Sequence, residues 1–479
     1  MSSLLTVDRD TSVYILGICG TAMATLAGML QARGCRVSGS DTGIYPPMSD
    51  FLARLRIPVK QGWDAANLEP RPDLVVVGNA IARGNAELEA VLDAGIPYFS
   101  MPEFLRLVFL PGKTPMVVAG THGKTTTSAL LAWCLTDLRA NPSFLVGGIP
   151  LNFHASYAVG AGPHFVIEGD EYDTAYFDKG PKFLHYRPSV LVINGIEYDH
   201  ADIYPDLESI VRQFELLVRL VPRGGRVIYN GECPNARRAA ARALCPADTF
   251  GLAEGCNWRA TGLEVSEGRT RFRVSRRGEA LGWLDIGLGG EHNVRNALAA
   301  CAVLDHLGFE WDAVRAAQAG FLGVERRMTL RGEVGGVAIY DDFAHHPTAI
   351  RLTLAGARTL FPGRRIWAVF EPRSWTCRKK VHQQAMAECV DDADGVILAD
   401  VFRKEALPPD DRFQPEAPAA DMAARGRDAH FLPGAAEIVD FLAERLKPGD
   451  VVIIMSNGGF DDIHHTLLER IPPRHEANS

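Results

Sequence analysis

The chain lacks the features that direct a protein into or across a membrane. No apolar run approaches the ~18 residues that a membrane-spanning helix needs. The N-terminal segment MSSLLTVDRD has neither the basic n-region nor the apolar h-region of a secretory signal, so we expect no export. The nine cysteines are dispersed between Cys19 and Cys389 without a CxxC pair, which excludes a disulfide framework and a zinc-finger pattern. Reduced thiols in the cytoplasm are the expected state.

The chain also lacks an excess of positive charge. It has 50 lysines and arginines against 58 aspartates and glutamates, a net charge of −8, and no basic block dense enough to follow a nucleic-acid backbone. We therefore expect no nucleic-acid and no membrane partner. Its 47% apolar and 23% charged residues are ordinary for a globular protein. At ~150 residues per domain, 479 residues predict about three domains.

The first part of the chain alternates apolar strands with helix-like segments. A strand over 12–17 leads through a Gly-rich turn and a helix-like run to a second strand that ends at Asp41. A strand over 73–78 and a helix around 86–94 continue this βαβ pattern, which predicts a parallel sheet. The turn GICGTAM at 17–23 departs from the GxGxxG dinucleotide fingerprint. It fits either a turn that binds no nucleotide or one that binds a nucleotide diphosphate.

A phosphate-binding loop opens the second part. A strand over 115–120 runs directly into THGKTTT and a helix-like segment. In this context backbone N–H groups and the helix N-terminus can hold phosphate oxygens. Lys124 would bring positive charge to the β- and γ-phosphates, and Thr125 would offer its hydroxyl to Mg²⁺. The spacing departs from GxxxxGK[ST], because Val118 stands where the first glycine would be. Taken alone, the loop predicts phosphate binding and no particular reaction.

Two polar segments follow apolar strands in the same part. EGDEYD at 168–173 follows HFVI, and IEYDHADIY at 196–204 follows SVLVING. Ligands of open α/β sheets bind at the carboxyl ends of strands. We therefore expect Glu168 and His200 to hold or orient Mg²⁺, which needs few protein ligands because it keeps several waters. Helix capping explains most of the other acidic residues here.

The second part closes with a helix that begins with two amides. GGEHNVRNALAACAVL at 289–304 places Asn293 and Asn296 on one helical face. Such amides can bind a purine and its ribose, or they can be structural amides of a capped helix, and both interpretations stay open. The part ends near GVERRM, where Arg326 and Arg327 precede a new strand.

The third part repeats the strand–helix alternation. A strand within 336–342 ends in two aspartates, and the pair His345–His346 precedes a proline at an expected helix start. Further strands are expected over 364–372, 395–400 and 450–459. This order predicts another doubly wound sheet. We expect a surface loop in the proline-rich stretch 404–420 and a frayed tail at 472–479.

The combined motifs resemble those of a known family. AGTHGKTTT, EGDE, NGIEYDH, EHNVRN, GVERR and YDDFAHHPTAI occur in the order and spacing of the Mur ligases, which build the peptide stem of bacterial cell-wall precursors. The likeness runs from residue 13 to about 465. It implies an α/β protein of three domains. These are a Rossmann-like domain that binds UDP-N-acetylmuramate (1–110), a central P-loop ATPase domain with a mostly parallel sheet (111–328), and a Rossmann-like C-terminal domain that closes on ATP and binds a peptide (329–479).

The resemblance implies an ATP-dependent ligase that forms an amide bond and needs Mg²⁺. Three details favour the branch that joins the tripeptide L-alanyl-γ-D-glutamyl-meso-diaminopimelate to UDP-N-acetylmuramate in peptidoglycan recycling. They are DEYDTAYFDKGPKFLHYRP at 170–188, FEPRS at 370–374 and MSNGGF at 455–460. The alternative is the branch that adds L-alanine in de novo synthesis, which shares every ATP-site motif. We expect a monomer or a weak homodimer.

The resemblance also assigns roles to residues. The expected ATP-binding residues are Gly120, Thr121, His122, Gly123, Lys124, Thr125, Thr126, Asn293, Asn296, Arg327, Asp342 and His346. The expected catalytic residues are Lys124, His200 and Arg327, and the expected metal ligands are Thr125, Glu168 and His200. The UDP sugar is expected at Gly17, Gly20, Thr21, Met23, Ser40 and Asp41. The peptide is expected at Arg373, Ser374, Asn457 and Gly458, although these four residues could instead shape a sheet edge.

Two other classes of protein fit the motifs less well. A nucleotide-dependent switch would use the phosphate loop without ligation, but it would not need the downstream Asn, Arg and Asp residues. A nicotinamide dehydrogenase would need a better dinucleotide fingerprint than the turn at 17–23.

We predict that Lys124→Ala abolishes ATP-dependent ligation and leaves the binding of UDP-N-acetylmuramate largely intact. The lysine charge serves the phosphates of ATP, whereas the UDP sugar is expected on another domain. ADP release and equilibrium binding of UDP-N-acetylmuramate measure the two properties separately. Equal loss of both would contradict separate sites.

Overall fold

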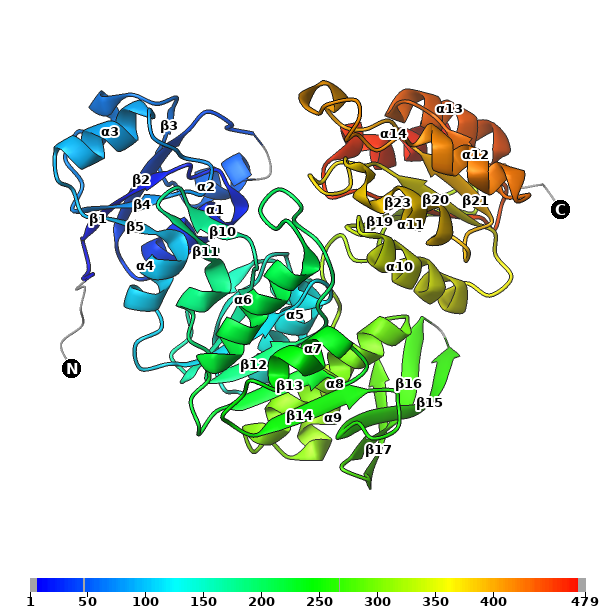
Figure 1. Cartoon of the computed structure of the whole chain (residues 1–479), viewed down its shortest axis with the longest axis horizontal. Helices are drawn as coiled ribbons and strands as arrows, with labels where there is room; N and C mark the ends of the chain where they lie inside the picture. Colours follow the sequence, from blue (N-terminus) through cyan, green and yellow to red (C-terminus); the bar gives the residue numbers. More distant parts are fainter. Residues whose placement is uncertain (1–6, 46–47, 267, 473–479) are drawn as a thin grey trace.

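The chain folds into three α/β domains that follow one another along the sequence, seen as the blue, cyan-to-green and yellow-to-red parts of Figure 1. The computed structural model describes residues 7–45, 48–266 and 268–472. The expected frayed tail lies outside them from residue 473 on. Within the described ranges, no helix is both long and apolar enough to span a bilayer.

The N-terminal domain is a five-stranded parallel sheet in the order β3-β2-β1-β4-β5, which is the order of a Rossmann-like half. Its elements are β1 (Ser12–Leu16), α1 (Thr21–Ala32), β2 (Arg36–Asp41), α2 (Met48–Arg54), β3 (Val59–Gln61), η1 (Ala65–Leu68), β4 (Leu74–Val77), α3 (Ala86–Asp93), β5 (Tyr98–Ser100) and α4 (Met101–Val108). Helices cover both faces, so the central strands read as continuous apolar runs. The expected βαβ pattern is confirmed.

The central domain is a ten-stranded sheet in the order β17-β16-β15-β14-β13-β12-β6-β9-β7-β8. Its strands are β6 (Thr114–Ala119), β7 (Ser143–Leu145), β8 (Tyr157–Ala158), β9 (His164–Gly169), β12 (Val190–Ile193), β13 (Arg226–Asn230), β14 (Ala247–Gly251), β15 (Trp258–Ser266), β16 (Arg269–Arg276) and β17 (Glu279–Ile286). A small hairpin of β10 (Asp173–Ala175) and β11 (Asp178–Pro181) stands apart. The strands from β15 to β7 run parallel, whereas β16 and β17 continue from β15 as an antiparallel extension, and the sequence patterns did not predict the strands β15 to β17.

Helices cover both faces of the central sheet. One face packs against α5 (Lys124–Asp137), α8 (Glu291–His306) and α9 (Trp311–Ala319), and the other against α6 (Leu207–Arg219) and α7 (Pro234–Ala240). The strands β12, β6 and β9 are neighbours, and their last residues Ile193, Ala119 and Gly169 lie in register. The loops that follow these three strands therefore leave the sheet at one edge.

The C-terminal domain is a six-stranded sheet in the order β18-β19-β23-β20-β21-β22, parallel except for β18. Its elements are β18 (Thr329–Val334), β19 (Val337–Asp342), α10 (Pro347–Leu360), β20 (Ile366–Phe370), η3 (Lys380–His382), α11 (Gln383–Glu388), β21 (Gly395–Leu398), η4 (Lys404–Ala406), α12 (Glu416–Ala424), β22 (Asp428–Phe431), α13 (Ala435–Arg445), β23 (Val451–Met455), η5 (Phe460–Asp462) and α14 (Ile463–Arg470). Together the three sheets confirm the expected three-domain architecture.

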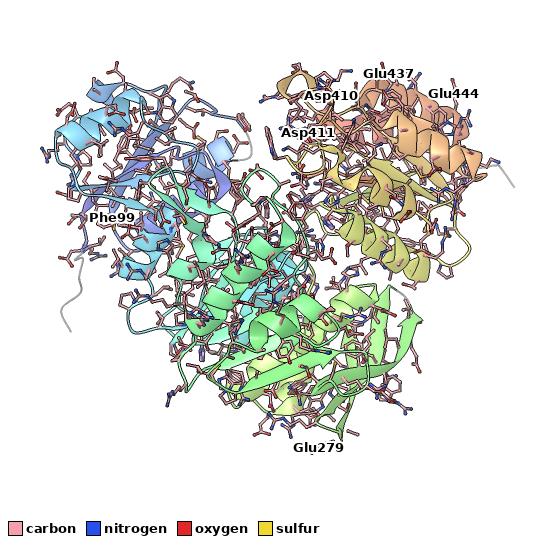
Figure 2. The ribbon with its side chains drawn as sticks, in the orientation of Figure 1. Phe99, Glu279, Asp410, Asp411, Glu437 and Glu444 are labelled. Atoms are coloured by element: carbon pink, nitrogen blue, oxygen red, sulfur yellow. The ribbon has the colours of Figure 1, made fainter. Side chains whose placement is uncertain are left out.

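The prediction of a surface loop over 404–420 is partly wrong. This segment contains η4, and α12 begins at Glu416 inside it. Pro415 precedes the helix, where its missing N–H costs no hydrogen bond, and the alanine-rich segment that follows buries Ala419 and Met422. The connection before α12 is exposed at Asp410 and Asp411, and Figure 2 labels these residues together with Glu437 and Glu444 of α13.

A buried carboxylate holds the N-terminal domain together. Glu87 of α3 has no exposed surface and accepts hydrogen bonds from the Ser40 hydroxyl, the Asn67 amide (2.5 Å), the Asp64 N–H (3.3 Å) and the Tyr14 hydroxyl (3.4 Å). These donors come from β1, β2 and the segment around η1. One carboxylate thus joins four segments at the end of β2.

We predict that Glu87→Ala destabilises the protein by about 2–4 kcal/mol, because four donors lose their acceptor inside the domain. The matched control is Glu89→Ala on the same helix, which removes an exposed ion pair with Arg83 and an exposed hydrogen bond from Gly84 N–H and should change stability little. Urea unfolding of the two variants provides the comparison. Equal effects would contradict the structural role of Glu87.

Candidate active site

The loop that the sequence predicts to bind phosphate, here called the phosphate-type loop, lies between β6 and α5. Gly120 and Gly123 have φ angles of +129° and +76°, which favour glycine. A Cβ on Gly123 would lie 2.6 Å from Asn296 Oδ1 and 2.7 Å from Asn194 Nδ2, so space as well as conformation requires glycine there. The loop therefore packs directly against the start of α8 and the end of β12.

Lys124 is the first residue of α5 and is held by a carboxylate. Its Nζ donates to Gly120 O at 2.8 Å and to the two Glu171 oxygens at 2.9 and 2.8 Å. Burial alone would lower the pKa of Lys124, but the charges of Glu171, Asp170 and Glu168 outweigh burial and raise it. The lysine is thus a fixed positive charge at the N-terminus of a helix, where anions bind.

Thr125 and Glu168 meet as the sequence predicts. The Thr125 hydroxyl donates to Glu168 Oε1 at 3.0 Å, and the Gly147 N–H donates to Glu168 Oε2 at 2.7 Å. Burial raises the pKa of Glu168 in spite of the opposing charge of Lys124. A hydroxyl and a carboxylate at one point are oxygen ligands of the kind that Mg²⁺ takes.

His200 contacts Glu171 rather than Glu168. Its Nε2 lies 3.3 Å from Glu171 Oε1, and its backbone is left-handed with φ +55°. Asp170, Glu171 and His200 offer ligand atoms that all lie within 4.8 Å of one another. Burial opposes a raised pKa at His200, but Glu171 and Asp199 outweigh it and raise the pKa. Burial likewise opposes a lowered pKa at Glu171, but Lys124 and His200 lower it.

The helix-capping interpretation of the acidic residues at 168–173 is wrong. The strand β10 follows this segment, so no helix starts there. Glu171 is only 2% exposed, and its carboxylate pairs with Lys124 and His200. The signal that could have identified it is the need of a buried lysine for a counter-charge at the neighbouring strand end.

The two amides of α8 lie against the phosphate-type loop. Asn293 Nδ2 donates to Gly289 O at 2.8 Å, and Asn296 Nδ2 donates to Asn293 Oδ1 at 3.1 Å. Asn296 Oδ1 accepts from Asn194 Nδ2 at 3.4 Å. No sequence motif pointed to Asn194. In the structure its buried Oδ1 has no hydrogen-bond partner among the residues that are described.

Asp342 organises the junction between the central and C-terminal domains. Its Oδ2 accepts from Met328 N–H at 2.8 Å, and its Oδ1 accepts from Ala344 N–H at 2.8 Å and the Thr353 hydroxyl at 3.3 Å. Burial raises its pKa although the charge of Arg327 opposes this shift. The Arg327 guanidinium lies over the Phe343 ring, 5.1 Å from its centre. Both expected ATP contacts are therefore near the junction, and the Asp342 carboxylate already has partners in both domains.

His346 brings the C-terminal domain to the phosphate-type loop. Its ring centre lies 4.8 Å from that of His122 and 4.6 Å from that of His382. Burial and the neighbouring His122 and His382 lower the pKa of His346 to about 3. Glu197 lies between the two domains. Burial would raise its pKa, but the His122 hydrogen bond and charge outweigh burial and lower it to about 2.

The turn at 17–23 differs in part from expectation. Gly17 has φ +78°, and Gly17 N–H and Ile18 N–H donate to Ser40 O at 2.9 and 3.1 Å. Asp41 Oδ2 accepts from Cys19 N–H at 2.9 Å, so its carboxylate shapes the turn.

Two side chains expected at the UDP sugar lie in the interior. The Ser40 hydroxyl is bonded to Glu87, and Met23 is buried in the core of the domain. Alternation along β2 and the inward face of α1 cause this burial, because they leave only part of each element at the surface. Gly20 and Thr21 are exposed at the turn.

The residues expected at the peptide gather at one end of the C-terminal sheet. The Arg373 guanidinium lies over the Phe402 ring, 3.8 Å from its centre, and Nη1 lies 3.4 Å from Glu371 Oε1. Gly458 packs against the arginine side chain. Ser374 is turned to its own loop, where its Oγ accepts from Cys377 N–H at 3.3 Å.

A cavity of about 260 Å³ is bordered by Glu371 and Phe402, the two residues that Arg373 contacts. Its lining includes Glu371 and Phe402, together with Asp400, Arg403, Lys404 and Asp461. Asn457 precedes Gly458 in the sequence, and its buried Oδ1 has no hydrogen-bond partner in the described part of the chain. Charges of both signs suit a ligand that carries both signs.

Comparisons with known proteins match all three domains. Residues 12–109 match the model of the Mur ligase family catalytic domain, 118–304 that of the Mur ligase middle domain, and 326–458 that of the Mur ligase glutamate ligase domain. The chain is 42% identical, over 97% of its length and 99% of the relative, to the UDP-N-acetylmuramate–L-alanyl-γ-D-glutamyl-meso-2,6-diaminoheptandioate ligase of Escherichia coli K12.

Two solved structures have a similar fold. A murein peptide ligase from Psychrobacter arcticus superposes with a TM-score of 0.72 at 36% identity, covering 96% of this chain and 98% of that one. A UDP-N-acetylmuramate–alanine ligase from Thermotoga maritima gives a TM-score of 0.79 at 25% identity with the same coverage.

We predict that Glu171→Gln lowers the pKa of His200. The raised pKa means that the Glu171–His200 contact stabilises the fold fully below the ordinary histidine pKa and is lost as pH rises through the raised value. Without the carboxylate, burial and the Lys124 charge lower the pKa, and only the Asp199 charge opposes them. NMR titration of the ring measures the shift.

The control is Glu469→Gln, which alters an exposed carboxylate beside His465 and should leave the His200 titration unchanged. An unchanged His200 pKa in Glu171→Gln would show that this pair is not coupled.

Proposed function

The chain belongs to the Mur ligase family, and from this we propose that it uses ATP to join L-alanyl-γ-D-glutamyl-meso-diaminopimelate to UDP-N-acetylmuramate. The observation that carries the proposal is 42% identity over nearly the whole chain to a ligase of that name. The site supports it, because a buried lysine, a hydroxyl–carboxylate pair and a histidine meet at the N-terminus of α5. The role is peptidoglycan recycling, in the cytoplasm where ATP and UDP sugars occur.

The chemistry needs activation of a carboxylate. A carboxylate is a poor acyl donor, so transfer of the γ-phosphoryl group of ATP to the UDP-N-acetylmuramate carboxylate would give an acyl phosphate. The peptide amine would attack this acyl carbon, and the tetrahedral intermediate would expel phosphate. Positive charge is the main requirement of the first step, since a carboxylate must approach an anionic phosphate. Lys124 supplies it.

Glu171 links the resting site to the loaded one. In the structure its carboxylate accepts hydrogen bonds from the ammonium group of Lys124. Phosphate oxygens of ATP would replace Glu171 as the partner of that ammonium group. Glu171 would keep its contact with His200, whose Nε2 is 3.3 Å from Glu171 Oε1. Lys124 thereby exchanges one anionic partner for another and is never left as an unpaired buried charge.

Mg²⁺ fits the residues present. Thr125, Glu168 and His200 would hold it, and Asp170 and Glu171 add carboxylate oxygens within reach of His200. Bound there, Mg²⁺ would neutralise phosphate charge.

The nucleotide and the two acceptor substrates divide between the domains. Gly120 to Thr126 would hold the phosphates of ATP. Asn293 and Asn296 would contact the adenosine end, with Arg327, Asp342 and His346 reaching it from the junction. Gly17, Gly20, Thr21 and Asp41 would bind the UDP sugar. Ser40 would contribute its backbone, and Met23 would support the turn from below, since both side chains are buried.

The peptide would bind at the end of the C-terminal sheet. Arg373 and Asn457 would contact its charged groups, while Gly458 leaves room for the arginine and Ser374 orders the loop. The cavity beside them has acidic and basic lining, and the third residue of the tripeptide ends in an amine and a carboxylate. The attacking α-amine has a pKa near 8, so about a tenth is uncharged at pH 7 and needs no strong base.

We predict that ADP release with ATP and UDP-N-acetylmuramate requires the tripeptide and is at least tenfold weaker with free L-alanine at equal concentration.

Arg373→Ala should raise KM for the tripeptide about tenfold or more, as expected for a lost charged contact, with KM for ATP unchanged. Steady-state ADP release measures the substrate preference and both KM values.

The control variant is Arg445→Ala, which removes an arginine that also lies over an aromatic ring, that of Phe441, away from the cavity lining. Preference for L-alanine would assign the chain to the alanine-adding branch. An unchanged tripeptide KM in Arg373→Ala would remove this residue from peptide recognition.

A further inference from the structure

Two histidines and a glutamate converge between the central and C-terminal domains. His122 of the phosphate-type loop places Nε2 3.2 Å from Glu197 Oε2, and His346 at the start of α10 places Nδ1 3.7 Å from the same oxygen. Ligand atoms of all three residues lie within 4.8 Å of one another. This His–Glu–His cluster is separate from the Asp170–Glu171–His200 group that is assigned to Mg²⁺.

The spacing fits a tetrahedral metal ion. Two ligands that are each ~2.0–2.1 Å from a zinc ion and separated by the tetrahedral angle lie about 3.3 Å apart. The distances to Glu197 Oε2 are 3.2 and 3.7 Å, within a few tenths of this value. The ligand nitrogens of His122 and His346 lie within 4.8 Å of each other, so the two rings would have to approach one another for the three atoms to surround one ion.

His346 is oriented as metal-binding histidines are. Its Nε2 lies 3.2 Å from the backbone oxygen of Tyr198, which can only accept, so this nitrogen carries the hydrogen. The lone pair is then on Nδ1, which accepts from Thr348 N–H at 3.2 Å and lies 3.7 Å from Glu197 Oε2, so a bound ion would replace the Thr348 hydrogen bond. Donation of the other ring N–H to a carbonyl is the usual support of a histidine ligand.

The other two residues are also held in place. Glu197 exchanges backbone hydrogen bonds with the Thr121 hydroxyl at 2.8 and 3.3 Å, and its carboxylate accepts from the Thr348 hydroxyl at 2.7 Å. The ring of His382 meets the ring of His346 edge to face, and the buried Nε2 of His382 has no hydrogen-bond partner within the described ranges. A prearranged donor set with an unused imidazole nitrogen beside it is more than a single interdomain ion pair requires.

We propose that His122, Glu197 and His346 form a binding site for a borderline divalent cation of the zinc type, with a fourth position open. Imidazole nitrogens suit Zn²⁺ and Co²⁺, whereas Mg²⁺ prefers oxygen ligands and octahedral geometry. The ion would connect the phosphate-type loop to α10 and so fix the C-terminal domain on the central one.

A consequence for activity rests on the proposed function. His122 and His346 are among the residues assigned to ATP, so the cation and the nucleotide would compete for them. Zn²⁺ should then raise the apparent KM for ATP, and excess Mg²⁺ should not relieve this effect.

Binding is tested on the full chain without nucleotide. Zn²⁺ is titrated in competition with a chromophoric chelator, and Co²⁺ is titrated by its visible absorption, which is intense only in tetrahedral sites. Glu197→Gln keeps the Thr348 contact but loses the charged ligand, and His346→Asn keeps a good helix cap but loses the imidazole. Each should weaken the first Zn²⁺ equivalent by more than about 100-fold, since even the loss of an orienting partner costs 10–100-fold.

Two controls separate this site from other histidines. His430→Asn removes an exposed histidine–carboxylate pair, and Glu171→Gln removes the carboxylate beside His200. Both should leave the first equivalent unchanged. Absence of a tight equivalent, its survival in Glu197→Gln and His346→Asn, or its loss in Glu171→Gln alone would overturn the proposal. None of these results depends on ligation, so the proposed function stands or falls separately.

Discussion

The active site depends on the ion pair between Lys124 and Glu171. A lysine in a buried position would give up its proton or destabilise the fold unless an anion lies beside it. Glu171 provides that anion and also contacts His200, while Lys124 binds the backbone of its own loop at Gly120. One charge pair thereby fixes the relative positions of three segments that are distant in sequence.

The parallel sheet makes this convergence possible. β9, β6 and β12 are adjacent and in register, so EGDE, the glycine loop and NGIEYDH leave the sheet at one edge. Gly123 completes the arrangement because its missing side chain lets Asn194 and Asn296 reach the loop. A larger residue there would push Asn194 and Asn296 away from the loop.

Local patterns predicted the fold where strand, glycine and helix follow one another, as at 115–137. They missed β15 to β17, which carry no motif, although the alternation of apolar residues with arginines in β16 is typical of a half-exposed strand. The rule that ligands bind at the carboxyl ends of strands pointed to Glu168 and His200, but the partner of His200 could not be predicted, since the pairing with Glu171 depends on how β9 continues into β10. The burial of Ser40 likewise depends on Glu87, 47 residues away.

The segment that follows β12 faces two domains at once. The Glu197 carboxylate and the Tyr198 carbonyl contact α10, Ala201 N–H donates to Thr376 at 3.2 Å, and His200 between them faces Glu171. Docking of the C-terminal domain and the position of His200 are therefore coupled through a single short stretch of backbone. A shift of the C-terminal domain would therefore change the surroundings of His200, and a shift of His200 would change the docking of that domain.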